Sequence, residues 1–112
     1  MAIAAILLGL GSLGGLVLLA LRLRGGNPPI GLAMGHGLLV GAGLVTLIVV
    51  AISGHATGAP IVAAAAFVVA GGIGAWLVSQ HLRGRVIPIA GVLLHGMFAL
   101  FGWAAMLGYY LG

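Results

Sequence analysis

Four apolar stretches of about twenty residues or more follow one another along this chain, and they decide what it can fold into. They cover residues 2–21, 29–52, 59–78 and 87–111. A helix of about 20 residues crosses a hydrocarbon core of about 30 Å. Strands of a membrane barrel are about half that length and alternate polar with apolar residues. The sequence therefore predicts an all-α integral membrane protein, a four-transmembrane-helix up-down bundle that forms one membrane domain over residues 1–112.

The residue types that the chain lacks exclude or disfavour several classes of function. Four arginines are the only charged residues, and Asp, Glu and Cys are absent. Without cysteine the chain cannot form disulfides, ligate an iron–sulfur cluster or attach haem through thioethers. Without an intramembrane carboxylate, proton-coupled transport is disfavoured. No soluble-enzyme motif and no catalytic residue is found, so the expected partner is the lipid bilayer and no nucleic acid is expected.

The arginines also predict an orientation. Arg22 and Arg24 follow the first span, and Arg83 and Arg85 follow the third. Short loops rich in arginine stay in the cytoplasm, so both loops are expected there, with both termini and the 53–60 loop outside. The expected location is a bacterial inner membrane. Trp103, Tyr109 and Tyr110, near the end of the last span, are expected in an aromatic belt at the interface.

A shift of 59 residues aligns the chain with itself without a gap. Pro29-Ile30 then matches Pro88-Ile89, and His36-Gly37 matches His95-Gly96. We interpret this as a tandem repeat of two helical hairpins, residues 1–53 and 60–112, which enter the membrane in the same direction. Such a parallel repeat has a pseudo-two-fold axis along the membrane normal.

The repeat predicts that two histidines lie at one depth. His36 and His95 each follow a helix-starting proline by seven residues, roughly 10 Å further in. In an up-down bundle the second and fourth helices are diagonal neighbours, so the two imidazoles can face each other. Gly43 and Gly102, two turns further on, are expected to leave room for a flat macrocycle.

These features together predict a cofactor site. A single haem b is expected, with His36 and His95 as its two axial metal ligands and therefore with a role in electron transfer. The haem propionates are expected to pair with Arg22, Arg24, Arg83 and Arg85, because arginine binds carboxylates well. His81 is interpreted as part of the basic interface and His55 as a loop residue.

Three other interpretations remain open from the sequence. The histidines could only form hydrogen bonds between helices, in a non-catalytic accessory subunit of a larger membrane complex. Each histidine could instead ligate its own chlorophyll-type pigment. A transporter or channel is a third class, which the missing carboxylate disfavours. The many glycines are expected to serve packing within the bundle, and the chain is expected to form a homo-oligomer or to join a larger membrane redox complex.

On His36, His95 and the two hairpins, the chain resembles the small four-helix membrane cytochromes and the haem-bearing membrane anchors of respiratory dehydrogenases. The resemblance implies electron transfer between a partner redox protein and the quinone pool. It also implies a redox carrier or subunit more than a stand-alone enzyme. The acidic residues and additional histidine pairs that such proteins often carry are absent here.

Overall fold

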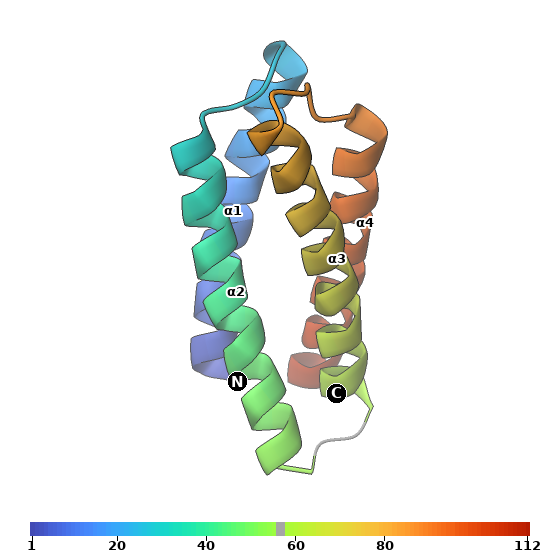
Figure 1. The fold of residues 1–112 in the computed structure, drawn as a ribbon. Helices are drawn as coiled ribbons and strands as arrows, with labels where there is room; N and C mark the ends of the chain where they lie inside the picture. The colour runs from blue at the N-terminus through green and yellow to red at the C-terminus, as the bar shows by residue number, and fades with distance from the viewer. Residues whose placement is uncertain (56–57) are drawn as a thin grey trace.

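The computed structural model describes residues 1–55 and 58–112 and consists there of four α-helices that run up, down, up and down (Figure 1). They are α1 (Ala2–Arg24), α2 (Ile30–Ser53), α3 (Ala59–Leu82) and α4 (Ile89–Leu111). All four are long and apolar enough to cross a membrane, so the protein is an integral membrane protein. The predicted loop 53–60 includes residues 56–57, which lie outside the described part.

The helix boundaries follow local chemistry at the arginine-bearing end. Pro29 and Pro88 are the N-caps of α2 and α4, with extended ψ values of 133° and 134°, and each helix begins at the next residue. Proline suits this place because its fixed φ and missing N–H cost little at a helix start. The preceding loops turn at Gly25 and Gly84, which are 59 residues apart and both have positive φ (123° and 74°). Glycine adopts that conformation without a steric penalty.

The helices associate as two hairpins, as the repeat predicted. α1 packs along α2, and α3 packs along α4, in the two most extensive helix pairs. Contacts between the hairpins are sparser: α2 meets α3, α1 only touches α4, and α2 and α4 lie diagonally across the bundle within the described residues. Both arginine loops lie at one end, and both termini lie at the other (Figure 1). The helices are therefore in more extensive contact within each hairpin than between the two hairpins.

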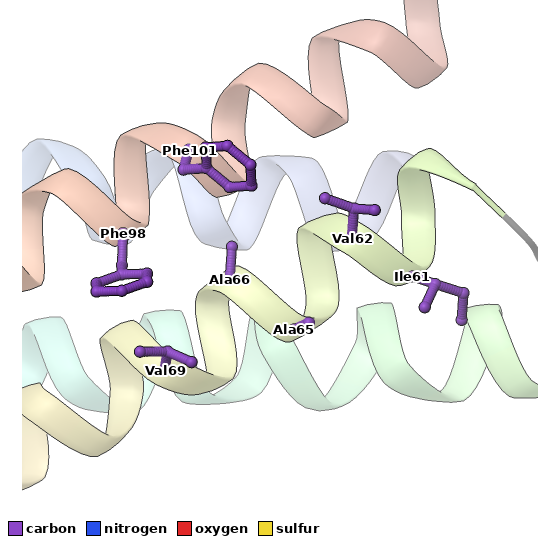
Figure 2. Close-up of a pocket in the computed structure, with 7 residues that line it drawn as sticks. All are labelled: Ile61, Val62, Ala65, Ala66, Val69, Phe98 and Phe101. Atoms are coloured by element: carbon purple, nitrogen blue, oxygen red, sulfur yellow. The ribbon is translucent and has the colours of Figure 1, made fainter.

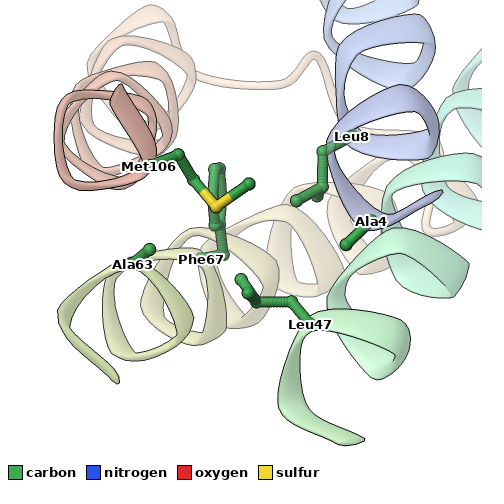
Figure 3. Close-up of a cluster of buried hydrophobic side chains, with 6 residues drawn as sticks. All are labelled: Ala4, Leu8, Leu47, Ala63, Phe67 and Met106. Atoms are coloured by element: carbon green, nitrogen blue, oxygen red, sulfur yellow. The ribbon is translucent and has the colours of Figure 1, made fainter. Parts of the chain in front are cut away.

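The main buried cluster lies at the end of the bundle near the termini. All four helices contribute to a cluster of buried side chains there (Figure 3): Ala4, Leu8, Leu47, Ala63, Phe67 and Met106. Leu8, Leu47 and Met106 are the largest fully buried side chains. This cluster ties the two hairpins together at one end.

The half of the bundle near the arginine loops is packed differently. No residue of segments 12–24, 30–42 or 89–101 is buried, and in segment 71–82 of α3 only Leu77 is. Protein interiors are normally close-packed. The side chains between the histidines and the arginine loops therefore keep surface that a further group can cover.

Candidate haem site between the two hairpins

His36 is anchored to the neighbouring helix of its own hairpin. Its Nδ1 lies 2.6 Å from the carbonyl oxygen of Gly11 on α1. A carbonyl oxygen only accepts hydrogen bonds, so Nδ1 carries the proton and donates it. In the neutral ring this leaves an unprotonated Nε2 with a free lone pair.

His95 repeats this arrangement in the second hairpin. Its Nδ1 donates to the carbonyl oxygen of Ala70 on α3 over 2.7 Å. Gly11 and Ala70 are themselves 59 residues apart, so the acceptors obey the same repeat as the histidines. The first and third spans, which resemble each other only weakly in sequence, thus offer equivalent acceptors to the two histidines.

A glycine on the partner helix makes room for each imidazole ring. A Cβ added at Gly15 would lie 2.9 Å from Cε1 of His36, and one at Gly74 would lie 3.1 Å from Cε1 of His95. Real Cβ atoms are rarely found so close to another carbon. Gly15 and Gly74 are also repeat equivalents, so each imidazole ring lies against a glycine at the same position of the repeat. We call these two glycine positions the ring seats.

The two anchored rings meet across the interface between the hairpins. Their centroids are 6.1 Å apart, and their planes stand at 83° to each other. Both residues are half-buried. Among the described residues, neither Nε2 atom has a hydrogen-bond partner. No buried side-chain nitrogen or oxygen in this part of the chain lacks a hydrogen bond. Both Nε2 atoms are therefore available to a ligand.

The spacing of the rings fits two axial ligands of one metal. A metal–imidazole bond is about 2 Å long and the ring centre lies about 1 Å behind the nitrogen, so rings on opposite sides of one metal are about 6 Å apart. No group of three or more metal-ligating side chains occurs in the described residues. Two histidines suit a metal that brings its remaining ligands with it, as the iron of a porphyrin does.

Gly43 and Gly102 lie against side chains of the neighbouring helix of their own hairpin. A Cβ at Gly43 would lie 2.8 Å from Cγ of Leu8, and one at Gly102 would lie 2.9 Å from the ring of Phe67. Leu8 and Phe67 thus fill the space beside these two glycines. The glycines allow close packing within each hairpin.

The four arginines lie together at one end of the bundle, away from the imidazole rings. Nε of Arg22 donates to the carbonyl oxygen of Ile87 (2.9 Å), and Nη1 of Arg85 donates to Oε1 of Gln80 (3.1 Å). Arg24 and Arg83 are exposed. Arg22 is two helical turns, roughly 10 Å, beyond the glycine that seats His36.

Trp103, one of the three aromatic residues expected in the belt, packs against α1 and α3. Its Nε1 donates to Oγ of Ser12 on α1 (3.0 Å), and its ring packs edge-to-face on Phe67 with centroids 6.0 Å apart. Tryptophan N–H groups usually find a partner when they are buried. The hydrogen bond joins α4 to α1, so Trp103 links the hairpins at a place where few other contacts do.

The remaining histidines lie outside the pair. His55 is exposed just after α2, with a positive φ of 48°, and His81 is half-buried in the last turn of α3. His81 is close to the arginine-bearing end, as expected for a residue of the basic interface.

A shallow apolar hollow marks the outer surface of α3 and α4 (Figure 2). It has a volume of about 340 Å³, and Phe98 and Phe101 of α4 stand over a stretch of small and branched side chains of α3. None of the predicted site residues lines it. In a membrane such a surface is in contact with lipid tails.

A scan of the chain against protein-family models and searches of curated proteins and of solved structures return no match.

Proposed function

We propose that this protein is a small membrane cytochrome b-like electron-transfer subunit that holds one haem b between His36 and His95. The observation that carries the proposal is the pair of Nδ1-anchored imidazoles, 6.1 Å apart, one from each hairpin. When bound, a haem with two histidine ligands supplies one-electron redox chemistry and no open coordination site.

Residues of this chain would hold the two imidazole rings in place and raise the basicity of their Nε2 atoms. The hydrogen bonds from Nδ1 to Gly11 and Ala70 fix the tautomer and the orientation of each ring and increase the basicity of Nε2. Gly15 and Gly74 let the rings lie against α1 and α3. The buried cluster beyond the histidines keeps water out from the end near the termini.

The bundle is packed differently on the two sides of the histidine pair. Towards the termini the space between the hairpins is filled by Leu8, Leu47, Phe67 and Met106. Towards the arginine loops no residue of α1, α2 or α4 beyond the histidine level is buried. In our proposal the interface between the hairpins would take the macrocycle around His36 and His95, and Arg22 and the other arginines, on the less packed side, would bind its propionates.

The proposed setting is a bacterial inner membrane with the arginine loops in the cytoplasm, which is the side that short basic loops prefer. The proposed role is to pass electrons between a partner redox protein and the quinone pool. Large apolar side chains cover the outer faces of all four helices. This supports association with a second copy or with a larger membrane redox complex.

The test is the absorption spectrum of the protein purified from a haem-replete host, with a pyridine haemochrome assay. We expect one haem b per chain, a Soret band and a reduced α-band. His36→Ala and His95→Ala should each abolish the low-spin spectrum. His55→Ala and His81→Ala are the matched controls and should keep it. A colourless wild-type protein would refute the proposal.

The same hydrogen bonds also favour a second candidate, an accessory subunit in which the histidines only join helices. His36→Gln and His95→Gln distinguish the two, because glutamine keeps a donor that can bond a carbonyl but is a poor haem ligand. If the histidines are only structural, the glutamine variants should retain the stability and complex assembly of the wild type. If they hold haem, the variants should fold but lose the α-band. Long-wavelength absorption with two pigments per chain would instead support the pigment-binding alternative.

A further inference from the structure

One asparagine joins the two hairpins at the arginine-bearing end. Nδ2 of Asn27 donates to the carbonyl oxygen of Arg85 (2.7 Å), and Oδ1 of Asn27 accepts from the N–H of Ile87 (2.8 Å). Arg22 adds a third bond across the same junction through the carbonyl oxygen of Ile87. These three bonds connect residues about 60 positions apart, from the first hairpin to the second. We call Asn27 and Arg22, with their partners Arg85 and Ile87, the loop clamp.

The clamp satisfies backbone groups that no helix can satisfy. Ile87 is buried and stands directly before Pro88, where the chain is extended and outside any helix. A buried N–H or C=O without a partner destabilises the folded state. The side-chain amide of Asn27 matches a peptide group in shape and in donor and acceptor, so it pairs with this segment as another strand would.

The clamp breaks the symmetry of the repeat. The position equivalent to Asn27 in the second hairpin is Val86, and the position equivalent to Arg22 is His81. Valine offers no side-chain hydrogen bond, so the second hairpin cannot form the same clamp in return. Asn27 is also the only asparagine in the chain.

The loop clamp joins the two hairpins on one side of the histidine pair, and the buried cluster joins them on the other side. The hairpins are fastened near the termini by the buried cluster and by the bond from Trp103 to Ser12. Between the histidines and the loops only Leu77 of the four helices is buried. The gap across which His36 and His95 meet is therefore fixed from one side by the core and from the other by the clamp.

We infer that Asn27 is a positioning residue, which sets the spacing of the two hairpins and so the separation of the His36 and His95 rings. The inference rests on the proposed function only where it concerns haem; the effect on hairpin spacing is independent of it. Loss of the two bonds of Asn27 should let the arginine-bearing end open.

The spacing can be measured directly because the chain contains no cysteine. Leu23→Cys with Leu82→Cys places two spin labels on exposed, repeat-equivalent positions at the arginine-bearing end. Ile52→Cys with Leu111→Cys does the same at the other end. Double electron–electron resonance on the full chain then gives a distance distribution for each end, with or without haem.

In the Asn27→Val variant, which copies Val86, we expect the distribution at the arginine-bearing end to shift to longer distances and to broaden. The distribution at the other end should not change. Gln80→Ala is the matched control: it removes a bond to Arg85 within one hairpin and should leave both distributions as in the wild type. Asn27→Asp keeps the acceptor for Ile87, so it should give an intermediate distribution, and it serves as the test if Asn27→Val does not fold.

Haem binding provides the second measurement. We expect Asn27→Val to lower the affinity for haem about tenfold and to convert part of the low-spin spectrum to high-spin, as one histidine is lost from the iron. Unchanged label distances in Asn27→Val would overturn the inference, whatever the spectrum. Changed distances in a chain that binds no haem at all would uphold the effect of Asn27 on spacing and refute the proposed function.

Discussion

Whether an imidazole ring can lie against the neighbouring helix depends on which residues of that helix are glycine. Gly14 and Gly15 are adjacent on α1 and both face His36, but they differ in clearance. A Cβ at Gly14 would be 3.8 Å from Cβ of His36, an ordinary contact, whereas at Gly15 it would be 2.9 Å from Cε1. One methyl group at position 15 therefore has to displace the ring, and one at position 14 does not.

We predict that Gly15→Ala damages the site and that Gly14→Ala does not. Overpacking of this kind costs about 1–3 kcal/mol. Gly15→Ala should lower the affinity for haem roughly tenfold and lower the melting temperature in detergent. Haem titration and thermal unfolding of both variants check this. Equal behaviour of the two variants would show that the ring of His36 is not seated on Gly15.

A glycine also lets the two helices of each hairpin pack closely, at Gly43 in the first hairpin and at Gly102 in the second. The two hairpins differ in the atoms that face this glycine. A Cβ at Gly43 would be 2.8 Å from Cγ of Leu8 and 2.9 Å from its backbone nitrogen. The three nearest atoms to a Cβ at Gly102 all belong to the ring of Phe67. A side chain can be shortened by mutation, but a backbone cannot.

This difference predicts opposite outcomes for two double mutants. Gly102→Ala and Gly43→Ala should each destabilise the protein by about 1–3 kcal/mol. Phe67→Leu should recover much of the loss in Gly102→Ala, because it removes the atoms that clash. Leu8→Ala should not rescue Gly43→Ala, because the backbone contact remains. Double-mutant cycles from thermal unfolding in detergent measure both couplings, and equal couplings would contradict the packing described for α1 and α2.

The elements themselves could be predicted closely from the sequence. The predicted spans begin within two residues of the observed helices, because hydropathy and helix-starting prolines are local signals. α1 and α3 extend about one turn further at the arginine-bearing end than predicted. In α1 the added turn contains Arg22 and Arg24, since arginine is a good helix former and its charge can reach the interface.

Side-chain partners could be predicted less well. Leu8 and Phe67 as the neighbours of Gly43 and Gly102 could not be predicted, because what faces a glycine depends on the rotation of the neighbouring helix. The match of Gly15 with Gly74 at a spacing of 59 was a usable signal for the ring seats. Asn27 gave no such signal, because its equivalent is valine.

At the scale of the whole molecule, duplication explains why a short chain with little buried core can still form a two-sided site. Each hairpin supplies one anchored histidine and one glycine seat, and the pseudo-two-fold axis brings the rings together. The contacts that join the hairpins are not duplicated: Trp103 with Ser12 and Asn27 with Arg85 occur once each. The repeat therefore builds the site, and the unique residues align its halves.

The orientation of the bundle is a property of the whole molecule, and the absence of cysteine makes it testable. With the arginine loops in the cytoplasm, a cysteine at exposed Ser53 should react in intact cells with a membrane-impermeant maleimide. A cysteine at exposed Val86, beside Arg85, should react only after the membrane is permeabilised. Labelling followed by gel shift measures both sites.

Changing all four arginines to glutamine should remove the preference for one orientation and give mixed labelling at both positions, because no other charged side chain biases the insertion. Labelling of Val86→Cys from outside would reverse the orientation and move the proposed haem edge to the opposite side of the membrane.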